Sequence, residues 1–125
     1  MSDLNKTPKE EFVELFRQRT KKLALDVIRF SQGLPKSEEA NIMKRQLLRS
    51  ATSVGANYRA ACRARSAAEF YSKVSIVIEE ADETIFWLEL LEESGITSKL
   101  TTTPLVKETT EILSVLAKAR KNTTR

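Results

Sequence analysis

The stretch SVGANYRAACRARSAAEF, residues 53–70, carries two competing signals, and their resolution decides the fold. Its glycine, serines and arginines are typical of a loop, whereas its recurring alanines favour a helix. The segment Ser66-Ala67-Ala68-Glu69 separates the two, because a serine followed three residues later by a glutamate is the capping box that starts a helix. We therefore predict that one helix ends at residue 64, that the chain turns near Arg65, and that the next helix follows Ser66. A glycine-rich phosphate-binding loop is not expected here.

Apolar periodicity extends this interpretation to the whole chain. Apolar and small residues recur at alternating steps of three and four, which gives each helix one stripe for burial. The predicted helices cover residues 8–32, 38–64, 67–94 and 103–121. Gly33-Leu34-Pro35 and Gly95 are expected to end two of them, and Thr103-Pro104 to begin the last. Because the connections are short, residues 1–125 are predicted to form a single all-α domain, an antiparallel up-down four-helix bundle.

Composition narrows the class of protein. The chain has 125 residues, 41% of them hydrophobic, but only 3 Gly and 3 Pro, too few for the turns of an all-β fold. The helical core is predicted to include Val54 and Val77. Cys62 is the sole cysteine, which excludes an intrachain disulfide and suits a reducing compartment. With no signal-peptide pattern and no apolar run long enough to span a membrane, we expect a cytoplasmic protein without membrane contact.

Histidine is absent, and this bears on catalysis. Di-iron bundles, catalytic zinc sites and most acyl-transfer triads need an imidazole. Two acidic pairs are spaced as in all-α nucleotide pyrophosphohydrolases that bind Mg²⁺: Glu79 with Asp82 and Glu80 with Glu83. The earlier pair, Glu11 with Glu14, lies far upstream, so solvated carboxylates are the simpler interpretation. We expect no metal site, no cofactor and no enzymatic activity, and a metal-dependent nucleotide hydrolase is the least favoured alternative.

Charge is segregated between the second and third predicted helices. Residues 40–65 hold six basic residues and no acid, whereas residues 66–94 hold eight acids and one lysine. At about 100° per residue, four of the arginines share one face with Thr52 and Ala56. Such a stripe can contact the phosphates of RNA or DNA. Alternatively, it can be a solvated face, or it can pair with acids of the next helix in the same or an adjacent subunit. We predict nucleic-acid binding by Arg45, Arg49, Arg59, Arg63 and Arg65, with a structural or protein-interaction scaffold as the alternative.

Two further features predict self-association. A mid-helix glycine costs about 1 kcal/mol against alanine, so Gly55 is expected to permit close approach of a neighbouring backbone. Trp87 beside Phe86 gives the third helix a second apolar side that one bundle core cannot use, which is typical of a subunit interface. Glu80 lies near this side and is expected to be partly buried and paired. We therefore predict a homo-oligomer whose interface includes Gly55, Tyr58, Glu80 and Trp87.

Residues 23–96 resemble a family of small proteins first noticed as reading frames inside intervening sequences of bacterial 23S rRNA genes. The matching residues are Leu34-Pro35-Lys36, the run Arg49-Ser50-Ala51-Thr52-Ser53-Val54-Gly55-Ala56-Asn57, Arg65-Ser66, Glu69-Phe70, and EADETIFWLELLEESGI at residues 80–96. In the commoner family pattern a Glu-Gly pair follows the asparagine-containing run, whereas Ala60-Ala61 stand here. A role tied to that acidic residue is therefore not expected in this chain.

The resemblance carries expectations of its own. It implies a four-helix bundle that assembles into a ring-like homopentamer. It also implies kinship with the accessory protein of diversity-generating retroelements, which binds nucleic acid and a reverse transcriptase through a basic surface. A protein partner is accordingly a further expectation, although many relatives have no established activity.

Overall fold

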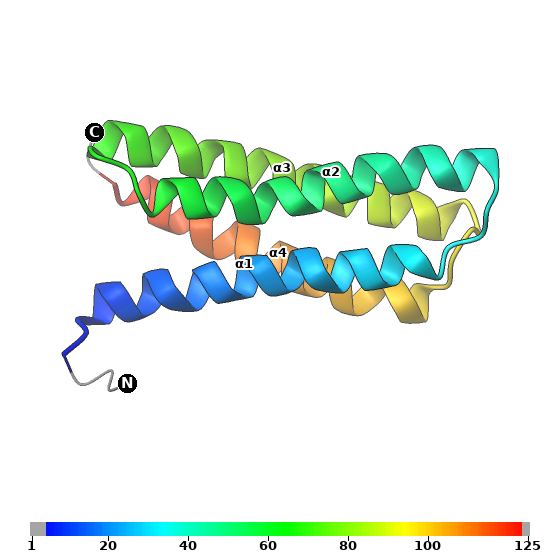
Figure 1. The fold of residues 1–125 in the computed structure, drawn as a ribbon, viewed down its shortest axis with the longest axis horizontal. Coiled ribbons are helices and arrows are strands. Elements are labelled where there is room, and N and C mark those ends of the chain that lie inside the picture. Colours follow the sequence, from blue (N-terminus) through cyan, green and yellow to red (C-terminus); the bar gives the residue numbers. More distant parts are fainter. Residues whose placement is uncertain (1–4, 124–125) are drawn as a thin grey trace.

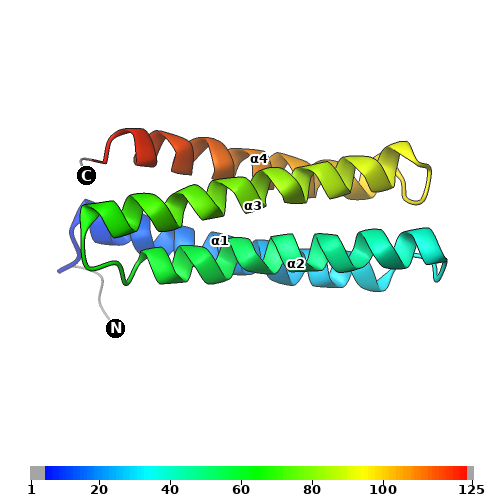
Figure 2. The same ribbon diagram turned by 90° about the horizontal axis from the view of Figure 1, so that it is seen from above.

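The computed structural model describes residues 5–123, which form four long helices joined by short turns (Figure 1). The helices are α1 (Pro8–Gln32), α2 (Glu38–Ala61), α3 (Ala67–Glu93) and α4 (Lys99–Lys121). Figure 2 shows that they lie alongside one another, with consecutive helices antiparallel. The start of α1 and the end of α4 lie at the end of the bundle that holds the turn between α2 and α3. The predicted all-helical, four-helix architecture is confirmed.

Side-chain caps start α1 and α3, and the cap of α3 is the one that the sequence predicts. The Thr7 hydroxyl accepts a hydrogen bond from the Glu10 backbone N–H at 3.1 Å, and the Glu10 carboxylate accepts one from the Thr7 N–H, so this capping box is complete. At α3 the Ser66 hydroxyl accepts from the Glu69 N–H at 3.1 Å. The Glu69 carboxylate accepts from the N–H of Arg65, one residue before the cap. Both helix starts therefore have side-chain partners for their first free N–H groups.

Gly95 ends α3 through its backbone conformation. Its φ of 81° lies in the left-handed region that glycine adopts without steric cost. The N–H of Gly95 donates to the Glu92 carbonyl, and the N–H of Ile96 donates to the Leu91 carbonyl at 3.1 Å. This pair of bonds is the Schellman motif, which satisfies the last carbonyls of a helix. The predicted stop at Gly95 is confirmed, with α3 ending at Glu93 rather than at residue 94.

Two other helix boundaries differ from the prediction. α2 ends at Ala61, three residues early, because the chain tightens there into turns with bonds between residues three apart. α4 begins at Lys99 instead of residue 103, so Pro104 lies inside the helix. The first turn of α4 is held from outside: Thr102 is buried, and its hydroxyl donates to the Glu92 carboxylate of α3 at 2.9 Å. Tertiary contact therefore places the helix start one turn before the proline.

The predicted stripes of all four helices meet in one core. The fully buried apolar side chains include Val27, Leu47, Val54, Val77, Leu88, Ile112 and Leu116. Burial of Val54 and Val77 is confirmed. The buried hydroxyls of Ser50 and Thr84 are satisfied, because Thr84 of α3 donates to the Ser50 hydroxyl of α2 at 3.0 Å and to the Glu80 carbonyl. The core is thus continuous across the α2–α3 contact.

The close approach predicted at Gly55 occurs inside the subunit. A Cβ placed on Gly55 would lie 3.3 Å from the backbone oxygen of Thr20 in α1, so the glycine lets α1 and α2 pack closely. Tyr58, one turn further, is only 1% exposed and packs near the Phe16 ring of α1. Tyr58 is therefore buried inside the subunit and offers no surface to a second copy, whereas the assignment of Gly55 to a subunit interface stays a prediction.

Candidate nucleic-acid interface

A groove of about 470 Å³ runs between α1 and α2 on the outside of the bundle. Its lining residues are Arg17, Gln18, Lys21 and Ala24 of α1, Thr52, Gly55, Ala56 and Arg59 of α2, and Arg63 of the turn that follows α2. The small side chains of Ala24, Gly55 and Ala56 leave the space between the helices open, while long cationic side chains extend from both helices. The close contact at Gly55 thus has a second consequence, a hollow with positive charge on either side.

Four cations line the groove, and no carboxylate does. Arg17 and Lys21 are one helical turn apart on α1, about 6 Å along its axis, whereas Arg59 lies on the last turn of α2 and Arg63 lies in the turn that follows Ala61. Arg17 already pairs with Glu14 of its own helix, with an Nη2–Oε1 distance of 2.7 Å. Within residues 5–123 no carboxylate lies within ion-pairing distance of Lys21, Arg59 or Arg63. Their charge faces solvent without internal compensation.

Arg49 has a different role from its neighbours on the arginine stripe. Its guanidinium donates to the two Glu80 carboxylate oxygens of α3 at 3.2 Å and also to Glu83. The hydrogen bonds that Arg49 donates to Glu80, and then the one that it donates to Glu83, raise the pKa of Arg49 above its ordinary value. Trp87 joins this cluster by donating its Nε1–H to Glu83 at 3.3 Å. Arg49 therefore differs from the other arginines of the predicted nucleic-acid surface, because acids of the same chain already bind it.

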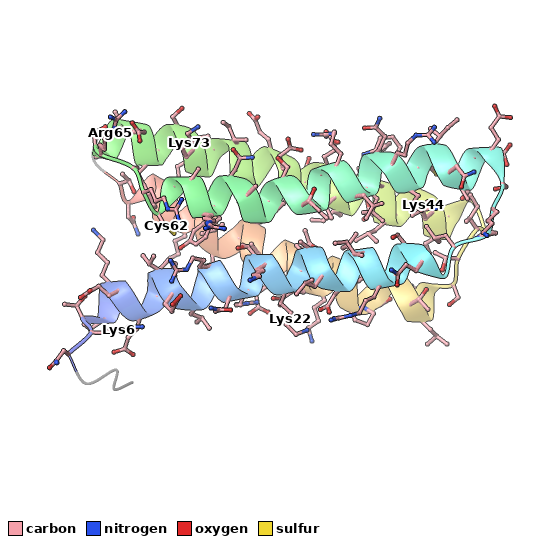
Figure 3. The ribbon with its side chains drawn as sticks, in the orientation of Figure 1. Lys6, Lys22, Lys44, Cys62, Arg65 and Lys73 are labelled. Carbon is pink, nitrogen blue, oxygen red and sulfur yellow. The ribbon has the colours of Figure 1, made fainter. Side chains whose placement is uncertain are left out.

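The other predicted arginines separate into two places. Arg59 and Arg63 come together in the groove. Arg45 is exposed on α2, but it lies 14 residues before Arg59, roughly 21 Å along the helix, and outside the groove. Arg65 lies beyond α2 at the turn into α3, near Cys62 (Figure 3), with a side chain 90% exposed and a 3.7 Å contact to Glu69. The groove therefore gathers two of the five predicted residues.

Sequence reasoning missed the α1 half of this site. Arg17 and Lys21 belong to a helix whose charges are mixed, so no single-helix pattern distinguishes them. They reach the groove because Gly55 packs against Thr20 and Lys21, which aligns the two antiparallel helices at that point. The available signal was the spacing of Arg17 and Lys21, one turn apart at the edge of the buried α1 stripe.

A second surface, on α3, is apolar. Phe86 is 51% exposed and Leu90 is 37% exposed, and the Phe86 ring packs edge-on against the partly buried Trp87 at 4.9 Å. We call Phe86, Trp87 and Leu90 the α3 aromatic patch. Glu80 is partly buried and paired, as predicted, with 18% of its side chain exposed. Its partner is Arg49 of the same chain, so this pairing is no indication of a subunit interface.

Two further reactive groups, the Tyr58 hydroxyl and the Cys62 thiol, lie one helical turn apart at the end of α2. Burial raises the pKa of the Cys62 thiol and, more strongly, that of the neighbouring Tyr58 hydroxyl, so both groups stay protonated near neutral pH. Within residues 5–123 no three or more His, Cys, Asp or Glu side chains are grouped so that they could hold a metal ion. None of the helices in this part of the chain combines the length and apolar character needed to cross a membrane.

Fold and charge distribution together define a small helical-bundle protein with a cationic groove. The model of the 23S rRNA-intervening sequence protein family matches residues 15–118. The chain belongs to this family, which confirms the resemblance seen in the sequence.

A solved structure and the curated proteins give the remaining comparisons. The chain is similar to a protein of unknown function from the S23 ribosomal protein family of Bacteroides thetaiotaomicron, solved by crystallography. The two share 31% sequence identity and a TM-score of 0.82, over 88% of this chain and 98% of the other. No curated protein matches the chain.

Proposed function

We propose that this protein is a non-enzymatic, cytoplasmic homo-oligomer that binds RNA or DNA through the basic surface of α2 centred on Arg59 and Arg63. The observation that carries the proposal is the uncompensated charge of the groove. Lys21, Arg59 and Arg63 face solvent and have no carboxylate partner in the part of the chain that the structure describes, whereas Arg49 pairs with acids of α3. If the arginines of α2 served only to pair with acids of the same chain, each of them would contact a carboxylate as Arg49 does.

Phosphate binding explains the arrangement in physical terms. Guanidinium groups form charge-assisted hydrogen bonds with phosphate oxygens, and each contact releases counterions from the nucleic acid. Glu80 and Glu83 of α3 pair with Arg49 and do not line the groove. A polyanion in the groove is therefore closer to the lining cations than to these acids, and the attraction outweighs the repulsion.

Self-association is the second part of the proposal. The family resemblance supports a homopentameric ring, and the α3 aromatic patch supplies exposed apolar surface for contact with a second copy. A ring would repeat the groove around its circumference. Because a few phosphate contacts per subunit are weak alone but combine on one polyanion, assembly would raise affinity without new kinds of contact.

The test is a salt titration of binding to fluorescein-labelled RNA and DNA. Wild-type affinity should fall steeply between about 50 and 200 mM salt, and the Arg59→Glu/Arg63→Glu variant should lower the logarithmic slope by about two. The matched control is Lys107→Glu/Lys118→Glu on α4, which changes the net charge equally at exposed positions away from the groove. Equal losses in both variants would show that net charge, and not this surface, determines binding.

The alternative function is a scaffold without nucleic-acid binding. The α3 aromatic patch favours it, because exposed apolar side chains of this kind are typical of protein–protein contacts. Wild-type protein that assembles normally but binds neither RNA nor DNA at about 50 mM salt would reject nucleic-acid binding and establish this alternative.

A further inference from the structure

We propose that the nucleic-acid site is the groove between α1 and α2, formed equally by both helices, and that it holds one sugar–phosphate backbone without stacking or reading the bases. This inference rests on the proposed function. It adds Arg17 and Lys21 as binding residues, and it states that the protein binds the phosphodiester backbone of the nucleic acid and not the bases.

The register of the two helices places cations on both walls. Gly55 lies against Thr20 and the Lys21 Cα, and a Cβ added to it would stand 3.3 Å from the Thr20 oxygen and 3.8 Å from that Cα. Because α1 and α2 are antiparallel, Arg59, one turn after Gly55, lies across from Arg17, one turn before Lys21. A strand that follows the groove is therefore contacted from α1 and from α2 alternately, which a basic stripe on one helix does not provide.

The groove is open because its centre carries small residues. Helix axes in contact are about 8–10 Å apart, a separation that larger side chains would fill. Here Ala24, Gly55 and Ala56 leave about 470 Å³ unfilled between the two cationic walls. A phosphodiester backbone that enters this space brings its phosphates within reach of guanidinium groups on both sides.

The lining offers no aromatic surface for base stacking. None of the nine lining residues is aromatic, whereas proteins that stack unpaired bases present Phe, Tyr, Trp or His. The uncharged polar groups of the lining are Gln18 and Thr52, and the Thr52 hydroxyl already donates to the Leu48 carbonyl at 2.7 Å. Contacts with phosphates position a nucleic acid but carry no sequence information.

The first experiment fills the groove without changing its charge. Ala56 is exposed, so Ala56→Leu should leave the fold and assembly intact while occupying the centre of the groove. We expect it to weaken binding to a labelled single-stranded RNA at least about tenfold, a loss comparable to that of one or two base contacts. Ala68→Leu, at an exposed alanine of α3, is the matched control and should bind as wild type does.

The second experiment compares the two walls. Arg17→Gln/Lys21→Gln and Arg59→Gln/Arg63→Gln each remove two charges, and each should lower the salt slope by about two. If Ala56→Leu and the α1 variant both bind normally while the α2 variant loses affinity, the groove is not the site, although nucleic-acid binding by α2 stands. If the wild-type protein binds no nucleic acid, both proposals fail.

The third experiment addresses the bases. Labelled homopolymers of A, C and U of equal length should bind within about threefold of one another, as expected for backbone contacts alone. A difference above about tenfold would overturn base-independent binding. Inorganic polyphosphate of matched charge should compete for the groove no better than RNA does. Clearly tighter binding of polyphosphate would show that polyphosphate is the ligand of the groove, and it would contradict nucleic-acid binding.

Discussion

Replacing Val77 with alanine tests the packing on which the bundle depends. Val77 lies at the middle of α3 and is 0% exposed within the core that all four helices share. The substitution removes two methyl groups and introduces no polar atom. Its cost therefore reports how tightly the core closes around this position.

The magnitude follows from burial. Two buried carbon groups account for about 1.6 kcal/mol of transfer free energy at about 0.8 kcal/mol each. An incompletely collapsed cavity of about 40 Å³ adds about 1 kcal/mol at 24 cal/mol per Å³. Alanine is a better helix former than valine by about 0.5 kcal/mol, which offsets part of the loss. We expect the free energy of unfolding to fall by about 2 kcal/mol.

The assay is urea unfolding followed by far-UV circular dichroism, at matched protein concentrations because assembly contributes to stability. Val54→Ala, equally buried on α2, should behave in the same way. Phe86→Ala removes a larger side chain from the same helix, yet it should cost the isolated subunit less because Phe86 is half exposed. A loss below about 0.5 kcal/mol for Val77→Ala, with an unchanged m-value, would refute the core packing described here.

Three further predictions concern the surface and the thiol. Light scattering of the wild-type protein should give a mass of roughly five times 14.2 kDa. The variant Phe86→Ser/Leu90→Ser should form smaller species, because it removes the exposed apolar side chains. An unchanged mass of this variant would exclude the α3 aromatic patch from the interface. Arg49→Met should lower the free energy of unfolding by about 0.2–1 kcal/mol. It should leave RNA affinity and the salt dependence of that affinity unchanged, because Arg49 already pairs with Glu80. A reduced salt slope would show that Arg49 contacts the nucleic acid. Alkylation of Cys62 by iodoacetamide should be slow at neutral pH and accelerate only above the ordinary thiol pKa of about 8.5. The reason is that burial raises the Cys62 pKa, and the reactive thiolate forms only as the pH passes that raised value. Rapid alkylation at neutral pH would contradict the burial of this thiol.

The sequence alone determined the helices and most of their ends. Steps of three and four between apolar residues identify the buried stripes, because a helix places such residues on one face whatever surrounds it. Thr7 and Ser66 mark helix starts, and Gly95 marks an end, through bonds that span only a few residues. The family could also be recognised at this level, since a serial pattern of residues needs no coordinates.

The tertiary structure decided what depends on the register between helices. The start of α4 at Lys99 rests on the bond from Thr102 to Glu92 of α3, which local helix signals around Pro104 do not contain. Likewise, the arginines of one stripe on α2 face two different helices. Arg49 donates hydrogen bonds to acids of α3, whereas Arg59 lines the groove together with residues of α1. Periodicity shows which residues share a face, but not which helix that face meets.

The groove itself is the clearest case of this division. Gly55 signals close approach in the sequence, yet both an adjacent subunit and a neighbouring helix would satisfy that signal. Only packing against Thr20 identifies α1 as the neighbour and brings Arg17 across from Arg59. Residues far apart in the sequence therefore form one cationic site, because long-range packing aligns the helices and local sequence carries no information about that alignment.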